Sequence, residues 1–164
     1  MRYYFLFIFV LLTFFGCMDN DEPDVDITVD AQLAYDLLNN ASDTVTIADR
    51  DYILEAFMWR DFMRGDNDDH SLTSVNHLVA LDSLSMPSYL DLTKQYVILN
   101  DSIWITDYTD QRDTLYDYKL SRVSREGPEW GINKSVSVIA EVTQITVDST
   151  YFIKVENITI IATF

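Results

Sequence analysis

Cysteine, histidine and basic side chains are scarce in this 164-residue chain, and each shortage excludes a class of function. The only cysteine is Cys17, so no disulfide can form within the chain. The only histidines are His70 and His77, and no serine stands in a Gly-x-Ser-x-Gly context. A nucleophile with a positioned base therefore cannot be recognised. No glycine-rich nucleotide loop is present either, so the sequence carries no motif of a known catalytic class.

The shortage of basic residues also limits the partners of the chain. It has 11 Lys and Arg against 27 Asp and Glu, a formal charge of −16. Binding to nucleic acid or to anionic lipid head groups depends on Lys and Arg, so the charge opposes both. High acidity can indicate disorder, but disorder also requires low hydrophobicity, and 48% of these residues are hydrophobic. We expect one folded domain with a core.

The first sixteen residues have the organisation of a signal peptide. Arg2 is the only charge before Cys17, and residues 3–15 are almost continuously apolar. This run is too short for a transmembrane helix, which needs about 20 residues. A basic start followed by a short apolar run is typical of a secretory signal. The alternative is a plain signal peptide or membrane anchor in which Cys17 occurs by chance.

The end of this run indicates where a lipid would be attached. Phe14-Phe15-Gly16-Cys17 resembles a bacterial lipobox, although Phe14 and Phe15 replace the commoner Leu-Ala or Leu-Ser. The resemblance implies that residues 1–16 are removed and that Cys17 is acylated. Two or more acyl chains on Cys17 would hold the protein stably in a lipid bilayer.

Residues 17–26 combine this cysteine with an acidic tether. Five acids and no base occur between Met18 and Asp26. Acidic runs at this position resemble those of surface lipoproteins of Bacteroidota-type bacteria, which implies an outer-membrane lipoprotein that faces the cell surface. A solvated linker on the periplasmic face is the alternative, because it needs the same residues.

The remainder divides into residues 27–43, a linker or short helix, and residues 44–164, a β-domain. Asp30 is a suitable N-cap for a helix over residues 31–39. From Thr44 onward apolar residues recur with a period of two. Residues 52–62 are apolar on both faces, which predicts an interior strand with both faces at least partly covered.

The spacing of these segments predicts an all-β fold of about eight strands. Asn100-Asp101-Ser102 separates two apolar runs and predicts a hairpin. In residues 134–147 the apolar residues change from even to odd positions, and in residues 150–164 they change from odd to even positions. This change of parity indicates a bulge or a strand that passes between sheets. We expect a single antiparallel domain of the β-sandwich type, with a small β-barrel as the alternative.

Three segments together resemble a group of small, uncharacterised bacterial β-domains. These domains have a strand reading Trp-Arg-Asp-Phe-Met-Pro and a later Gly-Pro-x-Trp-Gly turn. The corresponding segments here are residues 59–63, 96–104 and 126–131, although Arg64 replaces the proline. The resemblance covers residues 44–164 and implies a fold but no activity.

Acidic clusters are the candidates for a metal site. Asp66, Asp68 and His70 alternate in one segment, and oxygen ligands of this kind suit calcium. An EF-hand loop that began at Asp66 would need glycine and glutamate where Ser71 and His77 stand. We therefore interpret the segment as a solvated acidic loop, and the sequence predicts no metal and no cofactor.

The three tryptophans are candidates for ligand contact. Trp59 and Trp104 lie in strand patterns, where large rings are normally buried. Trp130 follows Glu126-Gly127-Pro128-Glu129, the strongest turn signal of the chain, so it is the best candidate for an exposed contact. Packing of Trp130 at one end of a sandwich is the competing interpretation.

Three functions remain open at this point. The first is a non-catalytic surface module that binds a glycan or a protein. The second is a structural or assembly subunit of an envelope complex, joined through an edge strand. The third is a hydrolase that uses carboxylates such as Asp61, Asp66 and Glu129, since two acids suffice for glycoside cleavage. The sequence cannot place any two of these acids at the separation required, so we expect no enzyme activity.

Overall fold

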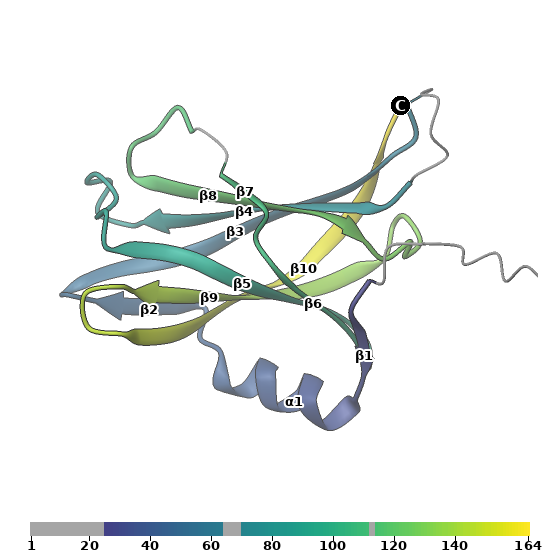
Figure 1. The fold of residues 1–164 in the computed structure, drawn as a ribbon, viewed down its shortest axis with the longest axis horizontal. Helices are drawn as coiled ribbons and strands as arrows, with labels where there is room; N and C mark the ends of the chain where they lie inside the picture. The colour runs from purple at the N-terminus through teal and green to yellow at the C-terminus, as the bar shows by residue number, and fades with distance from the viewer. Residues whose placement is uncertain (1–24, 64–69, 112–113) are drawn as a thin grey trace, which may run out of the picture.

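A computed structural model of the chain describes residues 25–63, 70–111 and 114–164, and it is an all-β domain with one short helix (Figure 1). The helix and strands of these residues are β1 Ile27–Val29, α1 Ala31–Asn40, β2 Thr44–Ile47, β3 Arg50–Asp61, β4 Leu72–Ala80, β5 Leu90–Leu99, β6 Ser102–Asp107, β7 Asp110–Gln111, β8 Lys119–Gly127, β9 Ser135–Gln144 and β10 Ser149–Thr163. The all-β prediction is confirmed. Among the described residues, β1 and β7 are the two strands beyond the expected eight. They have only 3 and 2 residues, too few to show an alternation of apolar and polar side chains.

The strands form one mixed sheet. Nine of them follow the order β1-β6-β5-β9-β10-β3-β4-β8-β7, and β2 pairs with β3. Residues 160–163 of β10 run parallel to β3, whereas the other strand pairs are antiparallel. This one parallel pair differs from the predicted antiparallel domain. The sheet curls until its two halves face each other, so the two layers of a sandwich are parts of one half-barrel (Figure 1).

β10 joins the two halves. Its first part pairs with β9, and after a register shift between Val155 and Ile158 its last part pairs with β3. Asn157 within this shift has a φ of 62°, the left-handed conformation that asparagine tolerates. The change of parity predicted either a bulge or a passage between sheets, and β10 has both. In β9 the change of parity instead marks the end of the strand at Gln144.

The core lies inside the curl. On β3 the side chains at alternate positions from Tyr52 to Arg60 are buried, and on β4 every second side chain from Leu72 to Ala80 is buried. Trp104 of β6 is 2% exposed and lies in this core. Its ring occupies the space beside Gly127, where a Cβ would lie only 2.6 to 2.8 Å from the ring carbons.

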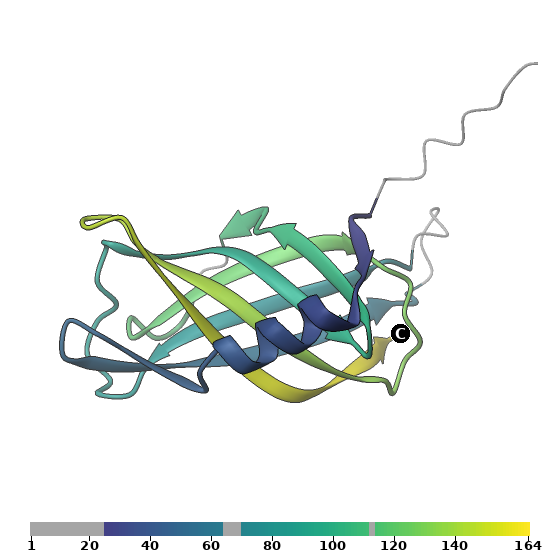
Figure 2. The ribbon, with the colours of Figure 1, turned by 90° about the horizontal axis from the view of Figure 1, so that it is seen from below.

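Helix α1 covers the outer face of the other half of the sheet. Asp30 caps it as predicted, because its Oδ1 accepts hydrogen bonds from the backbone N–H groups of Gln32 and Leu33 at 2.9 Å. The helix lies across the strands in Figure 2 and packs its leucines on Ile98 and Ile139. No helix of the described residues is long and apolar enough to cross a membrane.

The two halves of the sheet also meet along a junction that we call the seam, with β4 and β8 on one side and β5 and the end of β6 on the other. The amide nitrogen of Asn76 donates to the Gln95 carbonyl at 2.6 Å and to the Tyr108 hydroxyl at 2.8 Å. Burial raises the pKa of the Tyr108 phenol above its ordinary value. On the same seam, the Ser124 hydroxyl donates to the backbone carbonyl of Asp107 at 3.2 Å. Polar groups therefore link β4 to β5 and β8 to the end of β6, although neither pair of strands is adjacent in the sheet order.

Candidate functional site

The outer face of β3 carries apolar side chains that the helix does not cover. Since side chains alternate along a strand, burial of Tyr52, Leu54 and Met58 directs their neighbours Phe57 and Trp59 outward. Phe57 is 53% exposed, and Trp59 is half-buried. The sequence predicted that both faces of this strand are at least partly covered. Trp59 on the outer face is partly covered, whereas Phe57 on the same face is largely open to solvent.

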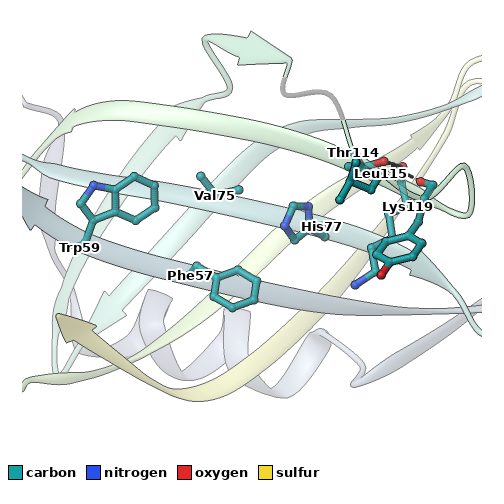
Figure 3. Close-up of a pocket in the computed structure, with 8 residues that line it drawn as sticks. Phe57, Trp59, Val75, His77, Thr114, Leu115 and Lys119 are labelled. Atoms are coloured by element: carbon teal, nitrogen blue, oxygen red, sulfur yellow. Dashed lines mark hydrogen bonds between the residues drawn. The ribbon is translucent and has the colours of Figure 1, made fainter. Parts of the chain in front are cut away.

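These rings line a groove over β3 and β4, with a volume of about 270 Å³ (Figure 3). We call it the outer groove. Its lining residues come from β3, β4, the start of β8 and the segment before β8: Phe57, Trp59, Val75, His77, Thr114, Leu115, Tyr116 and Lys119. The volume lies just below the range of about 300 to 1,000 Å³ usual for small-molecule sites, so the groove suits a small or partly enclosed ligand.

The segment Thr114–Tyr116 forms one wall of the groove. The Thr114 hydroxyl donates to the backbone carbonyl of Tyr116 at 2.6 Å and lies 3.3 Å from that of Lys119. The Tyr116 ring packs against Tyr118, with 5.2 Å between the ring centroids. Leu115 is 96% exposed on this wall. A leucine so exposed beside an aromatic groove is an apolar surface available to a ligand.

An ion pair stands at the same end of the groove. Lys119 Nζ lies 2.7 Å from Glu55 Oε2 and 6.0 Å from the centroid of the Tyr116 ring. Glu55 is on the same outer face of β3 as Phe57, two residues earlier. His77 of β4 meets the Phe57 ring edge to face, with centroids 5.7 Å apart. The outer groove thus combines aromatic surface with a donor and an acceptor, a composition that binding sites share.

The structure places the three tryptophans in different environments. Trp104 is buried in the core as predicted, but Trp59, also expected in the core, lines the outer groove. Trp130 is half-buried against the interior core and is not part of the groove lining. The Trp130 carbonyl lies 3.3 Å from Arg60 Nη1, which fixes the turn. Ligand contact by Trp130 stays a prediction, and Trp59 becomes the stronger candidate.

The acidic candidates do not assemble into a site in the described residues. Asp66, Asp68 and Cys17 lie outside these residues. Glu129 forms an ion pair with Arg60 at 3.0 Å, and Asp61 Oδ1 accepts a hydrogen bond from the Met63 backbone at 2.9 Å. Within the three described ranges, no group of three or more His, Cys, Asp and Glu side chains is arranged to hold a metal ion.

One signal in the sequence points to the outer groove. Glu55 and Asp61 occur at the same parity as Phe57 and Trp59, and a charged side chain normally reaches solvent. This parity predicts the solvent face for the two aromatic residues between the acids, although Arg60 at the opposite parity is also charged and is buried. No pattern in the sequence predicts that residues 114–119 line the groove, because their position depends on how that segment packs over β4.

Comparison with known proteins adds no relative from which a function can be transferred: no family model matches the chain, and neither a curated protein nor a solved structure matches it.

Proposed function

We propose that this chain is a membrane-tethered lipoprotein whose β-domain binds a glycan in the outer groove without cleaving it. The observation that carries the proposal is the row of exposed aromatic surface formed by Phe57 and Trp59 over β3 and β4. Sugar rings have flat faces of C–H groups that stack on aromatic rings, and their edges carry hydroxyls. The outer groove offers aromatic faces together with polar groups at one end, which suits both parts of a sugar.

The aromatic side chains are presented as a platform. Figure 3 shows the rings of Phe57 and Trp59 among the side chains that line the groove, with Val75 and His77 of β4 near them. Val75 of β4 lies beside them and is 2% exposed, so it forms a closed apolar floor. A rigid strand holds these side chains in position before a ligand arrives, which lowers the entropy cost of binding.

The arrangement of acids supports binding rather than hydrolysis. Glycosidases need two carboxyl groups about 5 to 9.5 Å apart. Glu55 and Asp61 both lie on the groove face of β3, but six residues of strand separate them by about 20 Å. Glu55 is also held in its ion pair with Lys119. The proposed role is therefore capture of a glycan at the cell surface.

The test is a binding measurement on the lipidated protein in a detergent without a sugar head group. A glycan array would identify ligands, and titration calorimetry would compare wild type with Phe57→Ala and Trp59→Ala. An aromatic contact contributes about 0.5 to 1.5 kcal/mol, so each variant should bind about two- to tenfold more weakly. Tyr35→Ala is the matched control, because Tyr35 is 64% exposed on α1, outside the groove lining. Equal binding by Trp59→Ala and wild type, or no glycan ligand at all, would refute the proposal.

A further inference from the structure

The outer groove has two chemically different ends along one strand. Glu55, Phe57 and Trp59 occupy alternate positions of β3 and therefore share its outer face. A strand rises about 3.3 Å per residue, so the row from Glu55 to Trp59 spans about 13 Å. This span is longer than one pyranose ring. A glycan that lies along β3 would place one sugar on the aromatic side chains and a neighbouring sugar beside the ion pair.

The apolar end continues onto the next strand. Ile161 of β10 is the registered partner of Trp59 and is 53% exposed. Phe57, Trp59 and Ile161 together give an apolar surface wider than one side chain. Such a surface offers no hydrogen-bonding groups. This end would therefore bind the face of a sugar ring with little dependence on the pattern of its hydroxyls.

The polar end can recognise hydroxyls more selectively. Lys119 donates and Glu55 accepts, and their charged atoms are 2.7 Å apart with side-chain exposures of 19% and 35%. Two adjacent hydroxyls of a sugar match this arrangement, because one can accept from the ammonium while the other donates to the carboxylate. The pair is charge-balanced, so it offers no net attraction to a charged sugar.

The net negative charge of the whole chain also disfavours binding of acidic sugars. With a formal charge of −16, the protein repels polyanions over roughly 10 Å at moderate ionic strength. On the basis of the proposed glycan binding, we infer that the outer groove selects a neutral oligosaccharide of at least two sugar rings. One ring stacks on Phe57 and Trp59, and the adjacent hydroxyls of another ring bind the Glu55–Lys119 pair.

The experiment compares neutral and acidic probes on the lipidated protein. The neutral probes are tetrasaccharides of glucose, mannose and galactose, and the acidic probe is tetragalacturonate. We expect at least one neutral tetrasaccharide to bind more than tenfold more tightly than tetragalacturonate at low salt. This ratio should fall as salt rises, because the Debye length shortens from about 30 Å at 0.01 M to about 3 Å at 1 M.

Variants of the pair test the polar end directly. Glu55→Met and Lys119→Met should each weaken binding of the neutral tetrasaccharide about fivefold, the effect of one lost hydrogen bond. Lys119→Arg should restore much of the affinity. Glu156→Met is the matched control, because it removes another surface Lys–Glu pair, Glu156 with Lys154 at 2.9 Å, outside the groove lining. Thermal unfolding of each variant would show that the domain remains folded.

The possible results separate this inference from the proposed function. If no sugar binds, the proposed function fails and this inference fails with it. If sugar binding depends on Trp59 but not on Glu55 or Lys119, the glycan function stands and the assignment of the polar end is wrong. Equal affinity for tetragalacturonate and the neutral probes would overturn the selection by charge.

Discussion

Arg122 on β8 and Asp91 on β5 form an ion pair, with 2.6 Å between the Arg122 guanidinium and Asp91 Oδ1. These two strands are not neighbours in the sheet order. The pair therefore joins the two halves of the curled sheet across the seam, where no backbone ladder connects them. Its side chains are only 16% and 32% exposed, so water screens their attraction less than that of a surface pair.

Loss of the Arg122 cation should weaken this seam. In Arg122→Met the carboxylate of Asp91 keeps its partial burial and loses its partner, so the free energy of unfolding should fall by about 1 to 3 kcal/mol. Chemical denaturation measures this change. Arg125→Met is the control, since Arg125 and Asp110 form an exposed pair at 3.3 Å that should contribute at most about 1 kcal/mol. Equal effects of the two substitutions would show that the seam pair has no special role.

Gly127 should not tolerate a side chain. Its Cβ would lie 2.6 Å from the nearest ring carbon of Trp104, which is itself enclosed in the core. Gly127→Ala should therefore lower the free energy of unfolding by about 1 to 3 kcal/mol, the usual effect of overpacking.

Gly131→Ala is the matched control for this substitution. Its Cβ would meet only the Lys134 side chain, at 3.7 Å. Because alanine also restricts the unfolded chain, Gly131→Ala should be neutral or stabilise the protein by up to about 1 kcal/mol. A Gly127→Ala protein as stable as Gly131→Ala would contradict the close packing of the Trp104 ring on Gly127.

The pair of Arg50 and Asp82 should make stability depend on acid pH. Two hydrogen bonds of 2.7 and 2.8 Å from the guanidinium lower the pKa of Asp82 from 3.8 to about 2. The unfolded chain therefore binds a proton at this side chain more readily than the folded chain does. The stabilising effect is complete above about pH 4 and is lost as the pH falls toward 2.

Denaturation of wild type and Asp82→Asn over this range checks the prediction. The difference in unfolding free energy between them should be constant from about pH 7 to about pH 5 and should shrink below about pH 4. Asp148→Asn, in the exposed turn between β9 and β10, controls for the loss of one negative charge. A difference that stays constant down to pH 2 would rule out a lowered pKa for Asp82.

Cys17 should determine membrane attachment. In a bacterial host that processes lipoproteins, wild type should partition into a detergent phase, and its processing should be sensitive to globomycin. Cys17→Ala should lose both properties, because acyl chains on this residue would supply the anchoring energy. Met18→Ala is the control and should behave as wild type does. Unchanged partitioning of Cys17→Ala would show that the anchor lies elsewhere.

Local patterns in the sequence determined the elements of the domain. The period of two predicted β3, β4, β8, β9 and β10, the run Asn100-Asp101-Ser102 predicted the β5–β6 hairpin, and Asp30 predicted the start of α1. These predictions hold because strand alternation and helix capping depend on residues only a few positions apart. The change of parity in residues 150–164 indicated either a bulge or a passage between sheets, and it left that choice open.

Only the tertiary structure decided which apolar residues are buried. Trp59 and Trp104 stand in similar strand patterns, but the curl of the sheet encloses Trp104 and leaves Trp59 on the outer face. The parallel pair of β10 with β3 joins residues 102 positions apart in the sequence, and the Arg122–Asp91 pair joins residues 31 positions apart. Strand alternation carries no information at such separations. The outer groove likewise depends on Lys119 meeting Glu55 across 64 residues of chain, a contact that only the folded sheet creates.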